Sequence, residues 1–323
     1  MKSFFSFFVF LILLISFSCR EKEEMKPINF DEFWQKTVEN LNNIPLEFEK
    51  QKEDTVIGGK KISLYKIRSF DDIYFYAWVS NPIQEKKFPV KIRFYGLGES
   101  SLKNSFPTHL WFLKQNGFIN MLVDIRGQGL STLQMKPKEY ITEGLKNKES
   151  FIYRGAFMDA VRSVDFIYNN SNHNGKIIVT GGSQGGALSI ATTALNKKVS
   201  LCIASFPFLT DIQSYNKNDW PMKTFIHKAR TEQIDFYKLK KTLSYFDMLN
   251  FTEKINVPIF IRTQENDKIT PPDGAVKLFN AIKKQKKVLY IEPCKGHGCS
   301  TNSKVANEME KIFIRNNLIT KKE

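Results

Sequence analysis

The amino-acid sequence predicts an α/β protein in which a mostly parallel central sheet carries helices on both faces. One observation behind this prediction is an alternation of short β-branched runs with helix-forming segments. Another is a glycine-rich junction, residues 181–186, where one such run passes directly into a helix-forming segment. The alternating strands and helices are Val90 to Tyr95, Thr108 to Gln115, Asn120 to Asp124, Phe157 to Tyr168 and Lys176 to Thr180.

The segments before this alternation are predicted to pack onto the same core. Asn29 to Asn43 has apolar residues at helical spacing and an aspartate in its first turn, which predicts an amphipathic helix. Tyr65 to Arg68 and Ile73 to Val79 alternate like strands, with Asp71-Asp72 as the turn between them. No linker rich in Pro, Gly or Ser interrupts the chain, so residues 29–323 are predicted to form a single domain.

Residues 1–18 have the features of an export signal. A lysine precedes an apolar run that is shorter than the ~20 residues needed to span a bilayer. The end of the run resembles a bacterial lipoprotein signal, with Ser18 before Cys19, although Ser16 stands where such signals usually carry leucine. We expect lipidation at Cys19 and a polar tether over residues 19–28. The protein would then be held in the periplasm or at the cell surface through its lipid alone, and ordinary secretion is the alternative.

The formal net charge of +15 brings nucleic acid and anionic surfaces into consideration. The lysines are scattered, however, and the densest group, residues 283–287, lacks interleaved aromatic residues or any nucleic-acid motif. We interpret the charge as a solvated basic surface and expect no nucleic-acid partner. Hydrophobic residues make up 42% and charged residues 25% of the chain, which is typical of a globular protein rather than a disordered one.

Three cysteines remain in the domain if Cys19 carries lipid. Cys294 and Cys299 can form a disulfide across their short loop in an oxidising compartment, leaving Cys202 in an apolar run. Free thiols are the alternative that the spacing leaves open. The close cysteine pairs with histidine partners that metal sites need are absent from the sequence. We therefore expect no metal and no other cofactor.

The junction at residues 181–186 has the G-x-S-x-G pattern of a nucleophile elbow, filled by Gly181, Ser183 and Gly185. A serine on so tight a strand-to-helix turn has a strained backbone and tolerates only small neighbours two residues away. The turn also places the amide of Gln184 at a helix start, where it can stabilise an oxyanion. The plainer alternative is a turn whose serine only caps the helix.

Two later loops supply candidate partners for Ser183. After the apolar run Val257 to Arg262 we expect a loop that contains Gln264 to Asp267. Asp267 then lies one strand and a turn downstream of Ser183, where the acid of a triad in the order Ser, Asp, His belongs. Glu265 is the rival carboxylate, and a solvated turn aspartate is the plainer interpretation. The chain has four histidines, and only His297 follows a late strand, Val288 to Ile291. Position and chain order therefore favour a triad of Ser183, Asp267 and His297.

Several motifs together connect the chain to a known family. They are Phe33-Trp34, Arg126-Gly127-Gln128, Tyr153-Arg154-Gly155 with Asp159-Ala160-Val161-Arg162, Gly181 to Gly186, Pro207-Phe208-Leu209, and Asp267 with Pro271-Pro272. In these motifs the chain resembles the acetyl xylan esterase and cephalosporin-C deacetylase group, also called carbohydrate esterase family 7. The resemblance implies an α/β-hydrolase fold. It also implies removal of acetyl groups from acetylated sugars, such as xylo-oligosaccharides, or other small acetate esters through an acetyl-enzyme.

Two further loops lie at predicted strand ends, where open α/β sheets place their sites. In α/β-hydrolases the second oxyanion donor comes from the loop after the first strand of the alternation, which assigns it to the backbone N–H of Leu97. A plain glycine turn is the alternative. Arg126, followed by Gly127 and Gln128, is predicted to brace the elbow, because a guanidinium can donate to several carbonyls at once. Holding a substrate group is the alternative for Arg126.

The chain departs from the family pattern at two places. The family usually has glutamate after its histidine, where this chain has Gly298, and a His-Gly-Tyr loop where it has Tyr95-Gly96-Leu97. We expect these departures to alter substrate preference rather than to abolish catalysis.

Two functions of other classes stay open at this point. One is a peptidase of the prolyl-oligopeptidase type, which shares the elbow pattern but normally adds a large N-terminal domain. The other is a non-catalytic glycan-binding surface lipoprotein, suggested by the glycine after His297. Family members often assemble into rings of six, so the resemblance also suggests a homo-oligomer, although no residue pattern in this chain predicts one.

Overall fold

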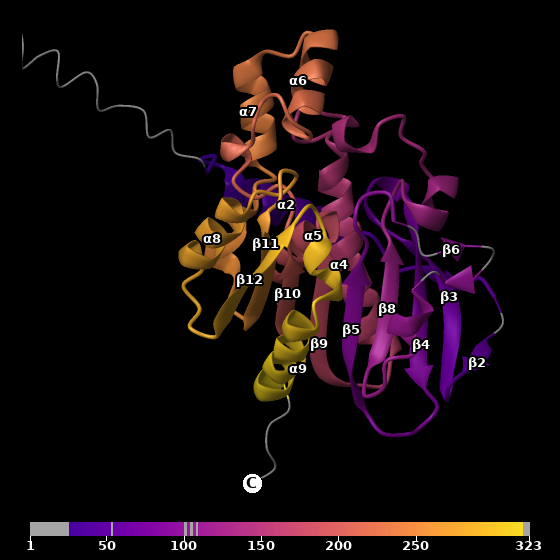
Figure 1. The fold of residues 1–323 in the computed structure, drawn as a ribbon. Coiled ribbons are helices and arrows are strands. Elements are labelled where there is room, and N and C mark those ends of the chain that lie inside the picture. The colour runs from indigo at the N-terminus through magenta and orange to yellow at the C-terminus, as the bar shows by residue number, and fades with distance from the viewer. Residues whose placement is uncertain (1–25, 53, 100–101, 104–105, 108, 319–323) are drawn as a thin grey trace, which may run out of the picture.

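The computed structural model describes residues 26–52, 54–99, 102–103, 106–107 and 109–318. Within this part of the chain, ten strands form one sheet and two short strands pair separately (Figure 1). The large sheet contains β1 (Phe48–Lys50), β2 (Thr55–Ile57), β3 (Lys60–Arg68), β4 (Tyr74–Pro82), β5 (Phe88–Phe94), β8 (Ile119–Asp124), β9 (His173–Gly182), β10 (Leu201–Ser205), β11 (Ile259–Asn266) and β12 (Lys287–Lys295). The separate pair is β6 (Leu102–Lys103) and β7 (Phe106–Pro107).

In the described residues one α-helix precedes the first strand, and from β5 onward the strands of the large sheet alternate with α-helices, as the sequence predicts. They are α2 (Phe30–Asn42), α3 (Leu110–Leu113), α4 (Ile152–Asn170), α5 (Gln184–Leu195), α6 (Met222–Thr231), α7 (Phe236–Ser244), α8 (Pro272–Ala281) and α9 (Lys304–Leu318). The short 3₁₀ helices are η1 (Phe70–Asp72), η2 (Gly129–Leu133), η3 (Tyr140–Thr142), η4 (Ile212–Ser214), η5 (Met248–Lys254) and η6 (Cys299–Asn302).

The strand order is β1-β3-β4-β8-β5-β9-β10-β11-β12, with β2 paired to β3. Strands β8, β5, β9, β10, β11 and β12 run parallel, and the N-terminal strands are antiparallel. The prediction of a mostly parallel sheet is therefore confirmed for the part that bears the loops of interest. Register pairs Phe94 with Gly181, Gly182 with Ser205, and Ser205 with Arg262. The carboxyl ends of these strands consequently meet at one edge of the sheet.

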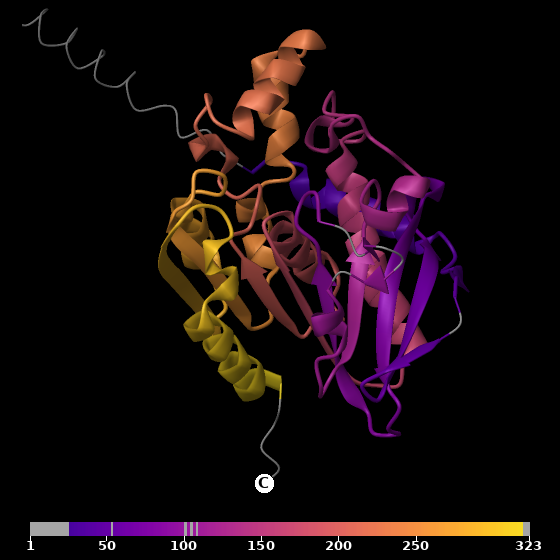
Figure 2. The ribbon, with the colours of Figure 1, turned by 45° about the vertical axis from the view of Figure 1, so that its right-hand side comes forward.

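Helices cover both faces of the sheet, as expected. On one face α2, α4, α5 and α8 bury the largest apolar cluster, and on the other α3 and α9 cover two smaller clusters. The N-terminal helix packs through aromatic rings: Trp34 stacks on Phe157 with ring centroids 5.4 Å apart, and its indole N–H donates to the carbonyl of Tyr245 at 3.0 Å. Helices α6 and α7 project beyond the end of the sheet (Figures 1 and 2).

Some element boundaries differ from those predicted. The segment Gln264 to Asn266, which we expected in a loop, continues β11 as its last residues. Within the described residues of the expected helix Thr108 to Gln115, only Leu110–Leu113 forms α3. For β11 the end is set by pairing with a neighbouring strand rather than by local sequence, because its pairs with β12 continue up to Asn266.

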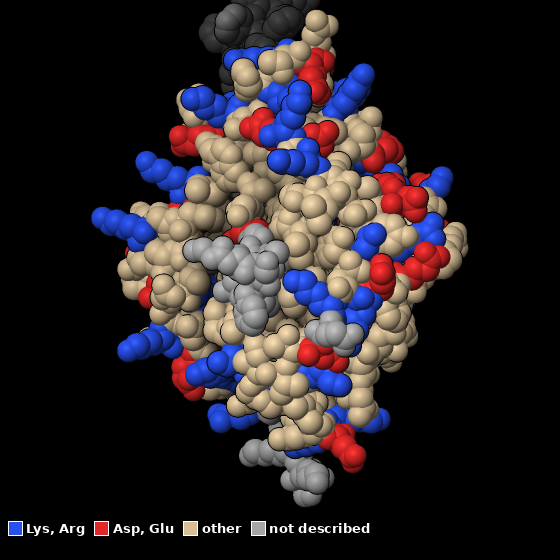
Figure 3. Space-filling model, turned by 90° about the vertical axis from the view of Figure 1, so that its right-hand side faces the viewer, with Lys and Arg blue, Asp and Glu red and all other residues tan. Residues whose placement is uncertain are grey.

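The surface carries charge of both signs. On the face shown in Figure 3, lysine and arginine side chains are interspersed with aspartate and glutamate around a largely uncharged middle. This arrangement fits a solvated basic surface. The helices of the described residues include none that is both long and apolar enough to cross a bilayer. The expected signal, residues 1–18, and the lipidation site Cys19 lie outside the described residues.

Candidate active site

Ser183 stands at the tip of the turn between β9 and α5. Its backbone has φ 55° and ψ −119°, a region that non-glycine residues rarely occupy. The turn is held from several sides, because the Ser183 N–H donates to the Ser205 carbonyl at 3.0 Å, and the Ser183 carbonyl accepts from the amides of Gly186 and Phe208 at 2.9 and 3.0 Å. These hydrogen bonds hold the strained backbone of Ser183 in place, as a nucleophile elbow requires.

The two glycines of the elbow pattern are required by close packing. A Cβ on Gly181 would lie 2.5 Å from backbone atoms of Gly185, and a Cβ on Gly185 would lie 2.3 Å from the carbonyl oxygen of Phe94. Both distances are shorter than any real contact of this kind. Gly181 and Gly185 therefore allow the elbow to close against the end of β5, which is the supporting role predicted for them.

The three predicted triad residues come together at the carboxyl edge of the sheet. The Ser183 hydroxyl donates to Nε2 of His297 across 2.9 Å, and His297 Nδ1–H donates to Oδ2 of Asp267 across 2.8 Å. Asp267 directly follows β11, and His297 lies in the turn after β12. The Asp267 side chain is fully buried, whereas that of His297 is 23% exposed. The rival carboxylate Glu265 is exposed at the end of β11.

Asp267 accepts hydrogen bonds on both carboxylate oxygens. Its Oδ1 accepts from the amides of Ile269 and Thr270 at 2.8 and 3.1 Å, and its Oδ2 accepts from Thr270 Oγ1 at 2.7 Å and from Gln264 Nε2. Burial by itself would raise the pKa of Asp267, but the bonds from His297 and Thr270 outweigh it and lower the pKa to about 2. The carboxylate of Asp267 is therefore ionised in the folded protein at neutral pH.

This lowered pKa predicts a specific loss of stability in acid. Since the folded-state pKa of Asp267 is about 2 and its ordinary value is 3.8, its contribution is fully present above pH 3.8 and disappears as pH falls through about 2. We expect the difference in free energy of unfolding between wild type and Asp267→Asn to shrink as pH falls below about 4. Urea unfolding at a series of pH values measures it. A difference that stays constant to about pH 2.5 would contradict the lowered pKa.

The two predicted oxyanion donors lie on either side of the elbow. Gln184 is the first residue of α5, so its amide has no acceptor within the helix. Its buried side chain accepts a 3.0 Å hydrogen bond from the Tyr153 hydroxyl, which fixes the helix start. Leu97 is half-buried in the turn after β5, and a Cβ on the preceding Gly96 would lie 3.6 Å from the Gly182 carbonyl. The structure therefore places both residues beside Ser183, and their function as oxyanion donors stays a prediction.

Arg126 braces a different part of the molecule from the one we predicted. Its guanidinium donates to both carboxylate oxygens of Asp159 on α4 at 2.9 Å and to the Phe70 carbonyl at 2.8 Å. Gly155 makes room for it, because a Cβ there would lie 1.9 Å from Nη1. None of its partners in the described part of the chain is an elbow carbonyl. A buried guanidinium is best compensated by a carboxylate, so Arg126 ties α4 to η1 instead.

The two residues after Arg126 shape the loop that follows β8. Gly127 has φ 69°, and a Cβ there would lie 3.0 Å from Pro137. Gln128 is 5% exposed beneath the loop. Both residues therefore support the fold of the loop beside Arg126.

Phe206 is a site residue that the sequence analysis missed. It follows β10 with φ 35°, and its ring meets the His297 imidazole edge-to-face with centroids 5.1 Å apart. A Cβ on Gly182 would lie 2.7 Å from the same ring. Phe206 therefore packs against the imidazole and the elbow and restricts the space beside Ser183. Its position directly before the Pro207-Phe208-Leu209 motif was the one available signal.

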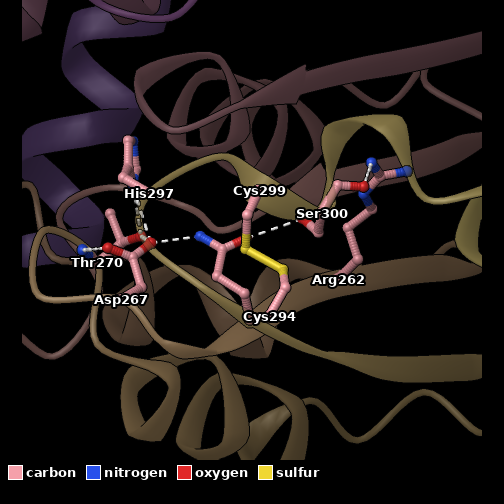
Figure 4. Close-up of a disulfide and its surroundings, with 8 residues drawn as sticks. Arg262, Asp267, Thr270, Cys294, His297, Cys299 and Ser300 are labelled. Atoms are coloured by element: carbon pink, nitrogen blue, oxygen red, sulfur yellow. Dashed lines mark hydrogen bonds and ion pairs between the residues drawn. A yellow bond between two sulfur atoms is a disulfide. The ribbon is translucent and has the colours of Figure 1, made fainter.

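The structure contains a disulfide between Cys294 and Cys299, one of the two alternatives left open by the sequence. Cys202 is free and buried. The disulfide closes the short turn that carries His297 (Figure 4). Both glycines of that turn, Gly296 and Gly298, have positive φ values, 93° and 78°, so the turn has little stiffness of its own.

We expect the double variant Cys294→Ser/Cys299→Ser to lose activity and stability. Closing a six-residue loop is worth about 2 kcal/mol in the chain-entropy account, and misplacement of His297 should lower kcat/KM by about 10-fold. Esterase assays and thermal unfolding with and without dithiothreitol measure both effects. Reductant should reproduce the loss in wild type and leave the double variant unchanged. Equal activity of oxidised and reduced wild type would contradict the expectation.

The order of the strands, together with Ser183, His297 and Asp267 at their carboxyl edge, is that of the α/β-hydrolase class. Two solved structures share this fold. An acetyl xylan esterase from Paenibacillus sp. R4 matches with a TM-score of 0.79 and 22% identity, over 91% of this chain and 96% of that one. Acetyl xylan esterase 1 from Thermoanaerobacterium sp. JW/SL YS485 matches with a TM-score of 0.77 and 20% identity, over 90% of this chain and 94% of that one.

The chain belongs to the acetyl xylan esterase (AXE1) family, whose profile matches residues 14–311. Acetyl esterase Axe7A from Xylanibacter ruminicola is 28% identical over 283 residues, which are 84% of this chain. The match spans 63% of the length of that protein. The predicted family and fold class are confirmed by these findings.

Proposed function

We propose that this protein is a serine esterase that removes acetyl groups from acetylated carbohydrates, such as xylo-oligosaccharides or related small acetate esters. The observation that carries the proposal is the unbroken hydrogen-bonded series from Asp267 through His297 to Ser183, at 2.8 and 2.9 Å. All three side chains come from one chain, so the triad needs no residue from a partner subunit.

The geometry supports a two-step reaction through an acetyl-enzyme. His297 Nε2 takes the proton of Ser183 as Oγ attacks the acetyl carbonyl, and the amides of Gln184 and Leu97 receive the oxyanion. The imidazolium, held by Asp267, then protonates the departing sugar oxygen as the ester bond breaks. Water repeats the sequence on the acetyl-serine, releasing acetate and returning the proton to Ser183.

The nature of the substrate is supported by relatives and by the wall of the site. The three relatives described above are named acetyl esterase or acetyl xylan esterases. The ring of Phe206 lies against His297 and limits the room beside the nucleophile, which favours a short acyl group. We propose that the departures at Gly298 and in the Leu97 loop give this protein a substrate preference different from that of the relatives.

A substrate panel tests the proposal. Purified protein from residue 26 onward should release acetate from acetylated xylo-oligosaccharides and hydrolyse p-nitrophenyl acetate. Relative to p-nitrophenyl acetate, kcat/KM for p-nitrophenyl butyrate should fall by about 10-fold or more. Cleavage of peptides with no turnover of acetate esters would favour a peptidase instead. Binding of xylo-oligosaccharides without any hydrolysis would favour a glycan-binding protein.

We also propose that the protein is exported and tethered to a membrane by lipid on Cys19. The apolar run before Cys19 supports this, and so does the Cys294–Cys299 disulfide, because disulfides persist in oxidising compartments. In bacterial cells fed labelled palmitate, the full chain should be labelled and sediment with membranes, and Cys19→Ser should be unlabelled. Label that survives the substitution would reject Cys19 as the lipid site.

A further inference from the structure

Gln264 joins the two segments that carry Asp267 and His297. Its side chain is fully buried on β11, and its Nε2 donates to Oδ2 of Asp267. Its Oε1 accepts a 2.8 Å hydrogen bond from the hydroxyl of Ser300. Ser300 belongs to η6, which begins at the disulfide residue Cys299 (Figure 4). One amide thus connects the strand that leads to Asp267 with the turn that follows His297.

The neighbours of this amide determine its orientation. The ionised carboxylate of Asp267 can only accept hydrogen bonds, so the N–H end of Gln264 must face it. Ser300 donates to the other end, and the Ser300 carbonyl accepts from Nη2 of Arg262 at 2.5 Å. Arg262 also donates to Asn307 on α9 at 2.9 Å. The connection is therefore anchored to the sheet and to α9, which do not take part in the triad.

Oδ2 of Asp267 accepts from three donors: Nδ1 of His297, Oγ1 of Thr270 and Nε2 of Gln264. Thr270 belongs to the same loop as Asp267, so its bond moves with that loop. Gln264 is the donor that belongs to a paired strand, three residues earlier in β11. Its bond is consequently the one that fixes the direction of the carboxylate relative to the sheet.

We infer that Gln264 is a positioning residue for the Asp267–His297 pair, an inference that rests on the proposed esterase function. Its amide balances part of the Asp267 charge and holds the carboxylate toward Nδ1. Without that N–H, more of the charge is balanced by the imidazolium, which favours protonated His297 and moves the acidic limb of the pH–activity profile to higher pH. Of the other titratable groups, Tyr215 interacts electrostatically with Asp267. Arg262 donates to the Ser300 carbonyl and has Glu310, Glu292, Arg93 and Tyr290 as its own charged or titratable neighbours.

Two substitutions of similar size separate this role from simple packing. Gln264→Met removes the donor and keeps the volume. Gln264→Glu keeps a donor, because a buried carboxyl beside the ionised Asp267 retains its proton and can donate to Oδ2 as the amide does. We expect kcat/KM to fall by about 10-fold in Gln264→Met and by less in Gln264→Glu, with KM within about 2-fold of wild type in both. The acidic limb should move upward in Gln264→Met and by less in Gln264→Glu. Ser300→Ala should shift it in the same direction by less.

The matched control is Thr263→Val, which removes a buried hydroxyl from the opposite face of the same strand. It should leave the acidic limb in place. The rate at which a fluorophosphonate labels Ser183 is measured in parallel, because it reports activation of the serine without an acetyl substrate. Wild type that is labelled but hydrolyses no acetate ester would overturn the proposed function alone.

Normal labelling and an unmoved acidic limb in Gln264→Met would overturn the positioning role alone, even if its melting temperature falls. Wild type that is neither labelled nor active would overturn both proposals. A slower labelling rate in Gln264→Met, with its pH dependence shifted upward and Thr263→Val unaffected, would support the role of Gln264 whichever ester is the natural substrate.

Discussion

Ser183→Ala is expected to lower kcat for acetate release by about 10⁶-fold, to the level left by substrate binding and the oxyanion donors. The variant removes the oxygen that carries the acetyl group, and no neighbouring side chain can replace it. The fold should be retained, because alanine also has a Cβ at the strained position and the backbone bonds of the turn remain. Acetate release from acetylated xylo-oligosaccharides and p-nitrophenyl acetate measures the loss.

Ser163→Ala provides the matched control. Ser163 is a buried serine of α4 whose hydroxyl bonds within its own helix, to the Ala160 carbonyl at 2.7 Å. Its replacement should leave turnover within about 2-fold of wild type. Mass spectrometry of acid-quenched wild type should find an acetyl group on the peptide that contains Ser183. Turnover that survives in Ser183→Ala would refute the acetyl-enzyme mechanism.

Asp267→Asn is expected to lower kcat by about 10⁴-fold while leaving KM nearly unchanged. The oxygen of the new amide can replace Oδ1, which accepts from the Ile269 and Thr270 amides. Its NH₂ group would then face His297 and force Nδ1 to accept. The imidazole proton would move to Nε2, which could no longer take the proton of Ser183.

Glu265→Gln is the control for this prediction, since Glu265 is the nearest rival carboxylate in sequence and is exposed. It should retain activity within about 2-fold of wild type. The pair of variants is compared by steady-state kinetics on p-nitrophenyl acetate. Loss of activity in Glu265→Gln with retention in Asp267→Asn would reverse the assignment of the acid.

The parts of the site that the sequence predicted are those determined by local rules. Ser183 is fixed by glycines two residues away, and the order of Asp267 and His297 along the chain follows the order of the strands. The parallel sheet brings these strand ends to one edge, so position in the sequence translates into position in space. The same reasoning predicted the N-terminal helix α2 and the strands β3 and β4, although their ends differ by a few residues.

The parts that the sequence did not predict depend on packing between distant segments. Gln264 and Phe206 occupy ordinary positions at the ends of β11 and β10, and only the folded arrangement brings them to Asp267 and His297. The partner of Arg126 was mistaken for a similar reason. Asp159 is 33 residues away on α4, and neither its burial nor its approach to the guanidinium can be seen in the local pattern.

The left-handed backbone at Gly298 has a consequence for any attempt to convert this protein to the usual family sequence. Gly298 has φ 78° and immediately precedes η6 and the cross-linked Cys299. Glutamate introduced there would have to adopt a conformation that costs a residue with a Cβ about 1 kcal/mol or more. The single substitution Gly298→Glu is therefore expected to strain the turn. Introducing the glutamate that the family usually has requires replacing the whole cross-linked turn, residues 294–299, together.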